Sequence, residues 1–166
     1  MYRNGHYGGA LLVYAPVGAI VFGLGYPTLA ALGGAIAVGG AMLPDLDQRV
    51  PLIAHRGITH TLWFALLAGG VLGGLGVFVG LEQGPTAAAR LGGFGAVVGV
   101  VTIGAHVLAD ALTPMGVRPF APLSRRKYTL GLVRADNTIA NYTLFALGVA
   151  AAALAFVGGN ALAAFL

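Results

Sequence analysis

Long uncharged stretches separated by short polar segments set the pattern of this chain. No formally charged residue occurs between His6 and Asp45. At ~1.5 Å per residue this stretch is too long for one helix across a bilayer and suits two short ones. Gly25-Tyr26-Pro27-Thr28 is the natural turn between them. The pattern predicts helices near 8–24, with Pro16 as a kink, and near 28–43.

Three more apolar stretches follow. They run over about 58–81, 91–112 and 139–166, and Glu82-Gln-Gly-Pro85 and Thr113-Pro114 end the first two. Gly, Ala, Val and Leu fill every side of these segments, so periodicity does not separate their faces, but the many glycines suit close helix packing in lipid. We therefore predict an all-α fold, a polytopic membrane bundle of five transmembrane helices forming a single domain over residues 1–166.

Composition supports a membrane location and narrows the chemistry. Hydrophobic residues make up 58% of the chain and charged residues 8%, whereas about a quarter of a soluble domain is charged. We expect an integral membrane protein that contacts membrane lipid. The chain has no cysteine, which excludes disulfides and thiolate metal sites and leaves His and carboxylate as the strong ligands.

Basic residues predict the orientation in the membrane. Five crossings put the N-terminus, 44–57 and 113–138 on one side, with eight of the nine basic residues: Arg3, Arg49, Arg56, Arg118, Arg125, Arg126, Lys127 and Arg134. This bias predicts a cytoplasmic N-terminus in the cell (inner) membrane. It also accounts for the net charge of +4 without a nucleic-acid partner. A rival reading, a cleaved signal over residues 1–37, is disfavoured because the segment before the first apolar run is weakly basic.

The same side collects nearly all of the groups that can bind a metal. All four histidines and four of the five carboxylates lie at this set of helix ends. Ionisable groups near lipid depth are expensive to bury, so they indicate binding or reaction. The candidate metal ligands are His6, Asp45, Asp47, His55, His60, His106 and Asp110.

Taken singly, the spacings are weak signals. His106 and Asp110 stand four apart on one helix face, where they could bind metal or form a simple ion pair. His55 and His60 flank a predicted helix start with Thr59 as a candidate first-turn cap.

The carboxylates complete the set. Asp45 and Asp47 follow a proline, and a turn there can point both at one cation, or they can be an ordinary polar loop. Together the seven groups suffice for two divalent ions with positions left for water and substrate. Nitrogen and oxygen ligands without sulfur favour zinc, then manganese or iron.

A proline-rich segment, Thr113–Tyr128, adds positive charge beside these ligands. Arg118 is the candidate for clamping a phosphate bidentately, and Arg56 is the second. The run Arg125-Arg126-Lys127 fits a topology signal that touches anionic lipid headgroups.

These motifs resemble one known family. The motifs Pro44-Asp-Leu-Asp47, His55-Arg-Gly-Ile-Thr-His60 and His106-Val-Leu-Ala-Asp110, with the segment around Thr113-Pro114, look like the YdjM-type family of membrane-bound metal-dependent hydrolases, also described as LexA-regulated inner-membrane proteins. The resemblance covers nearly the whole chain. The family is more distantly similar to zinc-dependent phospholipases C and P1-type nucleases, which are helical phosphodiesterases using several zinc ions.

We therefore expect a membrane enzyme that hydrolyses a phosphoester, such as an anionic phospholipid headgroup linkage, at the cytoplasmic face. Asp45 and Asp47 would act as ligand or general base, and Arg56 and Arg118 would hold the phosphate. One alternative is a metal or proton transporter, which the lack of ionisable residues near mid-membrane disfavours. Another is a non-catalytic scaffold with a structural metal site.

Overall fold

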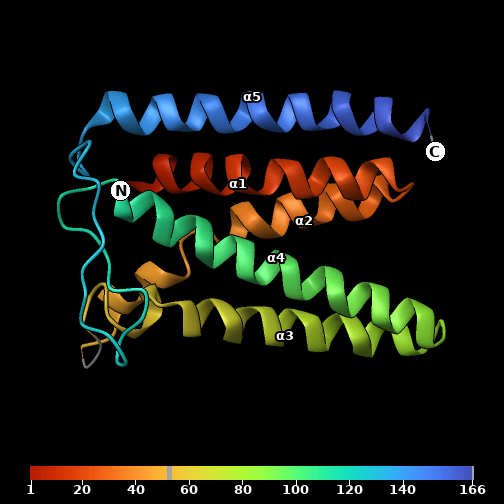
Figure 1. The fold of residues 1–166 in the computed structure, drawn as a ribbon, viewed down its shortest axis with the longest axis horizontal. Coiled ribbons are helices and arrows are strands. Elements are labelled where there is room, and N and C mark those ends of the chain that lie inside the picture. Colours follow the sequence, from red (N-terminus) through yellow and green to blue (C-terminus); the bar gives the residue numbers. More distant parts are fainter. Residues whose placement is uncertain (52–53, 166) are drawn as a thin grey trace.

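Five long helices lie roughly side by side in the computed structural model, which describes residues 1–51 and 54–165 (Figure 1). They are α1 (Arg3–Gly23), α2 (Pro27–Gly40), α3 (Leu62–Leu81), α4 (Pro85–Ala111) and α5 (Thr138–Ala163). Each is long and apolar enough to cross a membrane, α2 together with the short helix η1 (Pro44–Arg49) that follows it. The predicted all-α bundle of five spans is confirmed.

Two helices begin earlier than the charge pattern predicted. α1 begins at Arg3, not near 8, because its first turns are buried against the rest of the bundle. α4 begins at Pro85, not near 91, since proline is well suited to the first helical position. Arg90 is accommodated inside α4 because its guanidinium donates to the Tyr26 hydroxyl and lies over the Tyr26 ring.

The predicted start of the third span was also wrong. Residues Ile58–His60 form a separate short helix, η2, and α3 begins at Leu62. Its cap is Thr61, whose hydroxyl accepts from the Phe64 amide, so the cap assigned to Thr59 is corrected. α5 ends at Ala163, before its predicted end at 166, which lies outside the described residues.

The helices pack as two close pairs joined through the middle of the bundle. α3 packs along α4, α1 packs along α5, and α1 and α2 both contact α4. The α1–α5 backbones touch at Gly8 and Gly148, where a Cβ on Gly148 would lie 2.3 Å from the Gly8 carbonyl oxygen. Such contacts between small residues let helices approach closely in lipid, where the hydrophobic effect does not hold them together.

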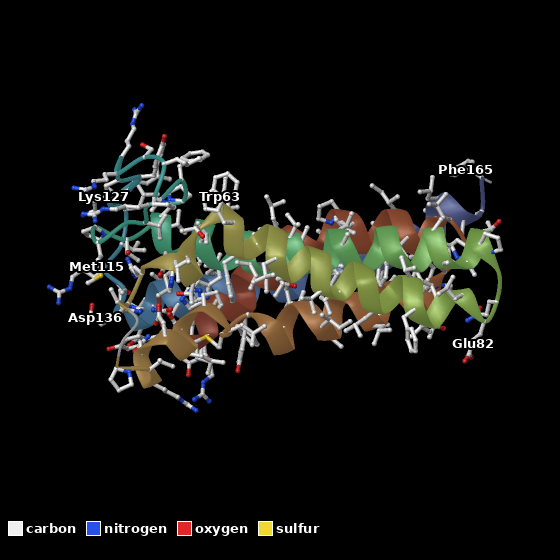
Figure 2. All side chains as sticks on the ribbon, turned by 90° about the horizontal axis from the view of Figure 1, so that it is seen from below. Trp63, Glu82, Met115, Lys127, Asp136 and Phe165 are labelled. Carbon is white, nitrogen blue, oxygen red and sulfur yellow. The ribbon has the colours of Figure 1, made fainter. Side chains whose placement is uncertain are left out.

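All polar connections except the two short turns lie at one end of the bundle. Lys127, Met115 and Asp136 mark that end in Figure 2, and Glu82 and Phe165 mark the other. The N-terminus, η1, η2 and the segment between α4 and α5 are together, as the alternation of crossings predicted. We call residues 112–137 the strap; Val117 and Tyr128 pair within it as an isolated antiparallel bridge.

Candidate metal centre

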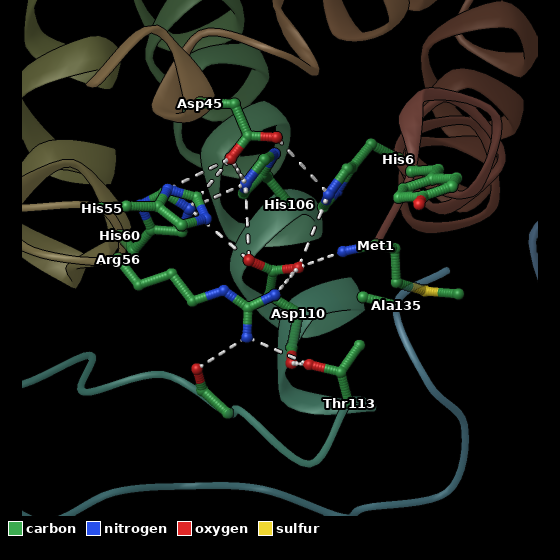
Figure 3. Close-up of polar contacts among 12 residues, drawn as sticks. Met1, His6, Asp45, His55, Arg56, His60, His106, Asp110, Thr113 and Ala135 are labelled. Atoms are coloured by element: carbon green, nitrogen blue, oxygen red, sulfur yellow. Dashed lines mark hydrogen bonds and ion pairs between the residues drawn. The ribbon is translucent and has the colours of Figure 1, made fainter. Parts of the chain in front are cut away.

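Four elements bring the predicted ligands into one place at the polar end of the bundle (Figure 3). α1 carries His6, α4 carries His106 and Asp110, and η2 carries His60; η1 carries the two aspartates. The three histidines in these elements and Asp110 are at most 1% exposed. Burial of this many ionisable side chains is costly unless they interact, so the cluster is a strong candidate for a functional site.

One group of four has the dimensions of a metal site. The Nε2 atoms of His60 and His106 are 3.1 Å apart. Asp45 Oδ1 lies 3.4 and 3.5 Å from them, and Asp110 Oδ2 lies 3.5 and 3.9 Å from them. An ion with bonds of about 2.0–2.1 Å in tetrahedral coordination holds its ligand atoms roughly 3.3 Å apart. The buried His and Asp cluster could therefore hold a metal ion.

Hydrogen bonds fix which nitrogen of each imidazole faces the centre of this group. His106 Nδ1 donates to the Ala41 carbonyl at 2.7 Å, so its Nε2 carries a lone pair. His60 Nδ1 lies 3.0 Å from the Thr59 hydroxyl oxygen, which itself donates to Asp47 and can accept from His60. Both Nε2 lone pairs then face each other, an arrangement that needs a positive charge between them, as a metal ion or a proton provides.

The charges around His60 also favour a positive charge at this position. Burial by itself lowers the pKa of His60, but hydrogen bonds to the carboxylates of Asp110 and Asp45 outweigh it, and the pKa of His60 is raised. A positive charge at this position is thus stabilised by its surroundings.

His6 lies on the other side of the two carboxylates. Its ring stacks on His106 with centroids 3.8 Å apart. Within the described chain neither of its ring nitrogens has a hydrogen-bond partner, although Nε2 is 3.5 Å from Asp110 Oδ1 and 3.9 Å from Asp45 Oδ2. A buried imidazole without a hydrogen bond is unusual. It indicates a second position at which the same carboxylates and His6 could meet a cation.

Asp110 also receives cationic groups from the protein. Arg56 Nη2 donates to its Oδ1 at 2.8 Å, and the amino group of Met1 contacts the same oxygen. Arg56 Nη1 donates to the Thr113 hydroxyl and to the Gly116 carbonyl, both at 3.0 Å. Arg56 therefore ties the strap to the centre. Its non-glycine backbone has a φ of +58°, a conformation that usually persists only where the surroundings hold it.

Asp47 and His55 form a neighbouring pair. His55 Nδ1 donates to Asp47 Oδ1 at 2.9 Å, and the Thr59 hydroxyl donates to Asp47 Oδ2 at 2.7 Å. Asp47 is buried, whereas the His55 side chain is 37% exposed. Asp47, His55 and His60 make a second set of potential ligands. The structure thus turns Asp45 and Asp47 to different groups, instead of both to one cation.

A basic pocket of about 280 Å³ adjoins this pair. His55, Arg56, Gly116, Arg118 and Lys127 line it. Arg118 and Lys127 are exposed, so the pocket presents free positive charge next to the buried cluster. Such a charge raises the local concentration of anions near the cluster.

Sequence reasoning missed three groups that position the ligands. Thr59 links His60 to Asp47, and Thr113 holds Arg56. Both stand inside motifs that the sequence singled out. The third, the Ala41 carbonyl, leaves no signal in the sequence because any residue supplies one.

These features define the class of the protein: a polytopic helical membrane protein with a buried His and Asp cluster that could hold a metal ion. The YdjM inner membrane protein family model matches residues 1–166, and the chain belongs to that family. No curated protein and no solved structure matches the chain. The distant similarity to phospholipases C and P1-type nucleases is therefore not shown.

Proposed function

We propose that this protein is a membrane-bound, metal-dependent hydrolase of a phosphoester and that its site faces the cytoplasm. The observation that carries the proposal is the pair of inward-facing Nε2 atoms on His60 and His106, enclosed by Asp45 and Asp110. The donor set fits a metal, and the basic pocket beside it fits an anionic substrate. The bias of basic residues to this end supports the cytoplasmic side.

We assign the first ion to His60, His106, Asp45 and Asp110, with zinc as the metal. When bound, the ion supplies Lewis-acid chemistry: it polarises a phosphoryl oxygen and makes a water more acidic. Asp45 is the exposed member of the group, at 11%. While only this ion is bound, the outer oxygen Oδ2 of Asp45 could accept a proton from water; a second ion at that oxygen would make Asp45 a ligand alone.

A second ion is proposed at the His6 side. There His6 Nε2 faces the outer oxygens of Asp45 and Asp110. Asp110 Oδ1 already accepts from Arg56 and contacts the Met1 amino group, so an ion bridged by the two carboxylates, as in two-metal hydrolases, would displace one of these cations. The set of Asp47, His55 and His60 is the weaker position, because Asp47 already accepts hydrogen bonds from His55, Thr59 and the Arg56 amide.

Phosphate binding is assigned to Arg118 together with Lys127, whose charges in the pocket are not neutralised by the cluster. Arg56 was the second candidate for this role. Its guanidinium already donates to Asp110, Thr113 and Gly116. We therefore assign it to positioning Asp110 and the strap.

Proton transfer to the leaving group is assigned to His55. Asp47 accepts from its Nδ1, which leaves Nε2 free to exchange a proton in the pocket. A buried carboxylate that orients a half-exposed imidazole is the usual arrangement for this task. Asp47 would then act through His55, not on the substrate.

A structural metal site in a non-catalytic scaffold is a second candidate. It is favoured by one observation, that three of the four ligands in the main group are nearly inaccessible to solvent. Structural zinc sites have four protein ligands, and catalytic ones keep a position for water. X-ray absorption of the zinc-loaded protein separates the two: the four protein ligands alone would support the scaffold, and a further oxygen ligand from water or added phosphate would support the hydrolase.

The deciding experiment measures metal and activity together. Wild type, His60→Ala and His106→Ala are purified in detergent, and their metal content is measured by elemental mass spectrometry. Hydrolysis of bis(p-nitrophenyl) phosphate and of phosphatidic acid is measured on the same samples. Arg134→Ala is the matched control, because Arg134 is exposed and, among residues 1–51 and 54–165, its side chain pairs with Asp136 alone.

We expect bound zinc or manganese and hydrolysis in wild type and in Arg134→Ala, and loss of both in the two histidine variants. Metal-loaded wild type that cleaves none of the esters would exclude the hydrolase and leave the scaffold. Wild type that binds no metal would exclude both.

A further inference from the structure

An apolar groove opens on the membrane-spanning surface between α2 and α3, with α4 as its floor. Its volume is about 530 Å³. Ile36, Gly39 and Leu43 line one side, Phe64 and Val71 the other, and Ile103 the floor. The Thr102 hydroxyl in the floor donates to the Val98 carbonyl, so it offers no free donor to an occupant. The groove therefore suits a hydrocarbon.

The groove leads to the metal centre. Leu43 precedes Asp45 by two residues, Phe64 follows His60 by four, and Ile103 precedes His106 by three. The three segments that line the groove are thus the three that carry most of the centre, within about one helical turn.

The groove spans about two thirds of one leaflet of a bilayer. Seven residues separate Phe64 from Val71 within α3, which is about 10 Å along the helix. The hydrocarbon of one leaflet is roughly 15 Å deep. α2 and α3, both wholly described, each pack on α4 and not closely on each other, so the groove is open to the lipid.

We infer that the groove seats an acyl chain of an anionic glycerophospholipid whose phosphate lies between the metal centre and the basic pocket. This inference rests on the proposed function and names its substrate class. Charge complementarity selects an anionic lipid, because Arg118 and Lys127 line the basic pocket beside the centre to which the groove leads. A second apolar hollow, of about 290 Å³ around Tyr14 and Phe156, is lined only by residues at least five positions along the chain from any proposed ligand.

Substitution of Gly39 by a larger residue can fill part of the groove. It is exposed on the groove wall, and a Cβ at this position meets nothing within 4 Å. Gly39→Leu therefore introduces its Cβ without a clash and extends a side chain from the groove wall, and leucine is favoured over glycine in a helix. Gly70→Leu is the matched control, since Gly70 is an equally open, exposed helical glycine outside the groove.

The test uses wild type and both variants in phosphatidylcholine nanodiscs containing phosphatidic acid with a photoreactive diazirine on one acyl chain. After illumination, labelled peptides are quantified by mass spectrometry. We expect labelling concentrated in 36–43 and 64–72, reduced about fivefold in Gly39→Leu, roughly 1 kcal/mol of affinity, and unchanged in Gly70→Leu. A phosphatidylcholine probe should label these segments less.

Labelling spread evenly over all lipid-facing helices, or equal in Gly39→Leu and wild type, would overturn the inference. So would equal labelling of the groove by the neutral probe. Hydrolysis, measured in parallel, keeps the two proposals apart. Groove labelling without any ester hydrolysis would support the lipid site and reject the hydrolase. If Gly39→Leu hydrolyses both the soluble diester and the lipid as well as wild type does, the lipid site alone would be rejected.

Discussion

His60 is the residue on which the centre most depends, because both of its ring nitrogens make contacts there. Nε2 faces His106 and the two carboxylates, and Nδ1 contacts Thr59. The residue types and most of the residues of this buried cluster could be predicted from the sequence, since ionisable residues at helix ends of a membrane protein are rare. Which aspartate faces which histidines could not be predicted, because it is the path of η1 that turns Asp45 and Asp47 to different groups.

Removing the hydroxyl of Thr59 should weaken metal binding without touching a ligand. In Thr59→Val the His60 Nδ1 loses its partner and the imidazole is less well oriented. Such supporting groups are typically worth 10–100-fold in metal affinity, so we expect a loss of about that size in a competition assay with a zinc chelator. Thr59→Ser should restore wild-type affinity. Equal affinity in all three proteins would mean that Thr59 does not orient His60.

His55 should affect turnover more than metal binding. If it exchanges the proton with the leaving group, His55→Gln lowers kcat by about 10²–10⁴-fold and leaves the main ion in place. Elemental analysis and steady-state kinetics on the same sample check this. Loss of a metal ion in His55→Gln would instead place His55 among the ligands, as the sequence pattern first suggested.

At the scale of the helices, small residues determine how closely the elements approach. The number of spans followed from the apolar stretches, whereas the starts of α1 and α4 were misplaced because charge was taken as a boundary. Arg90 lies within α4 since Tyr26 receives its guanidinium, and that contact between distant segments has no local signal.

The contact between α1 and α5 is testable through Gly148. A methyl group there would lie 2.3 Å from the Gly8 carbonyl oxygen, and overpacking of this kind costs about 1–3 kcal/mol. Gly148→Ala should therefore lower the free energy of unfolding in detergent by that amount. Gly158→Ala, on the same helix with nothing within 4 Å of the added carbon, should match or exceed wild type. Similar stability of the two variants would contradict the close contact.

At the scale of the whole molecule, charge separates the two ends. The strap, η1 and η2 share one end with the metal centre, and Glu82 lies at the other (Figure 2). The common end could be predicted from alternation along the chain. Which pockets and grooves form there could not, since they depend on how α2, α3 and α4 pack.

The absence of cysteine makes the orientation easy to measure. Single cysteines at Leu123, in the strap, and at Gln83, in the opposite turn, are both exposed. A membrane-impermeant maleimide applied to intact cells should label Gln83→Cys and spare Leu123→Cys until the membrane is opened. The reverse pattern would place the metal centre outside the cytoplasm and remove that part of the proposal.

The hydrogen bond from the His106 imidazole to the Ala41 carbonyl gives this side chain a second, structural role. Ala41 is the C-terminal cap of α2, and its carbonyl is one of the backbone acceptors that a helix end leaves unpaired. In a membrane no water replaces such a partner cheaply. His106 thus caps the end of α2 with one nitrogen and leaves the other facing the candidate metal position, so under the proposed function folding and metal binding would depend on the same side chain. His106→Asn, which can still donate to that carbonyl but lacks the Nε2 position, would separate the two duties where His106→Ala removes both.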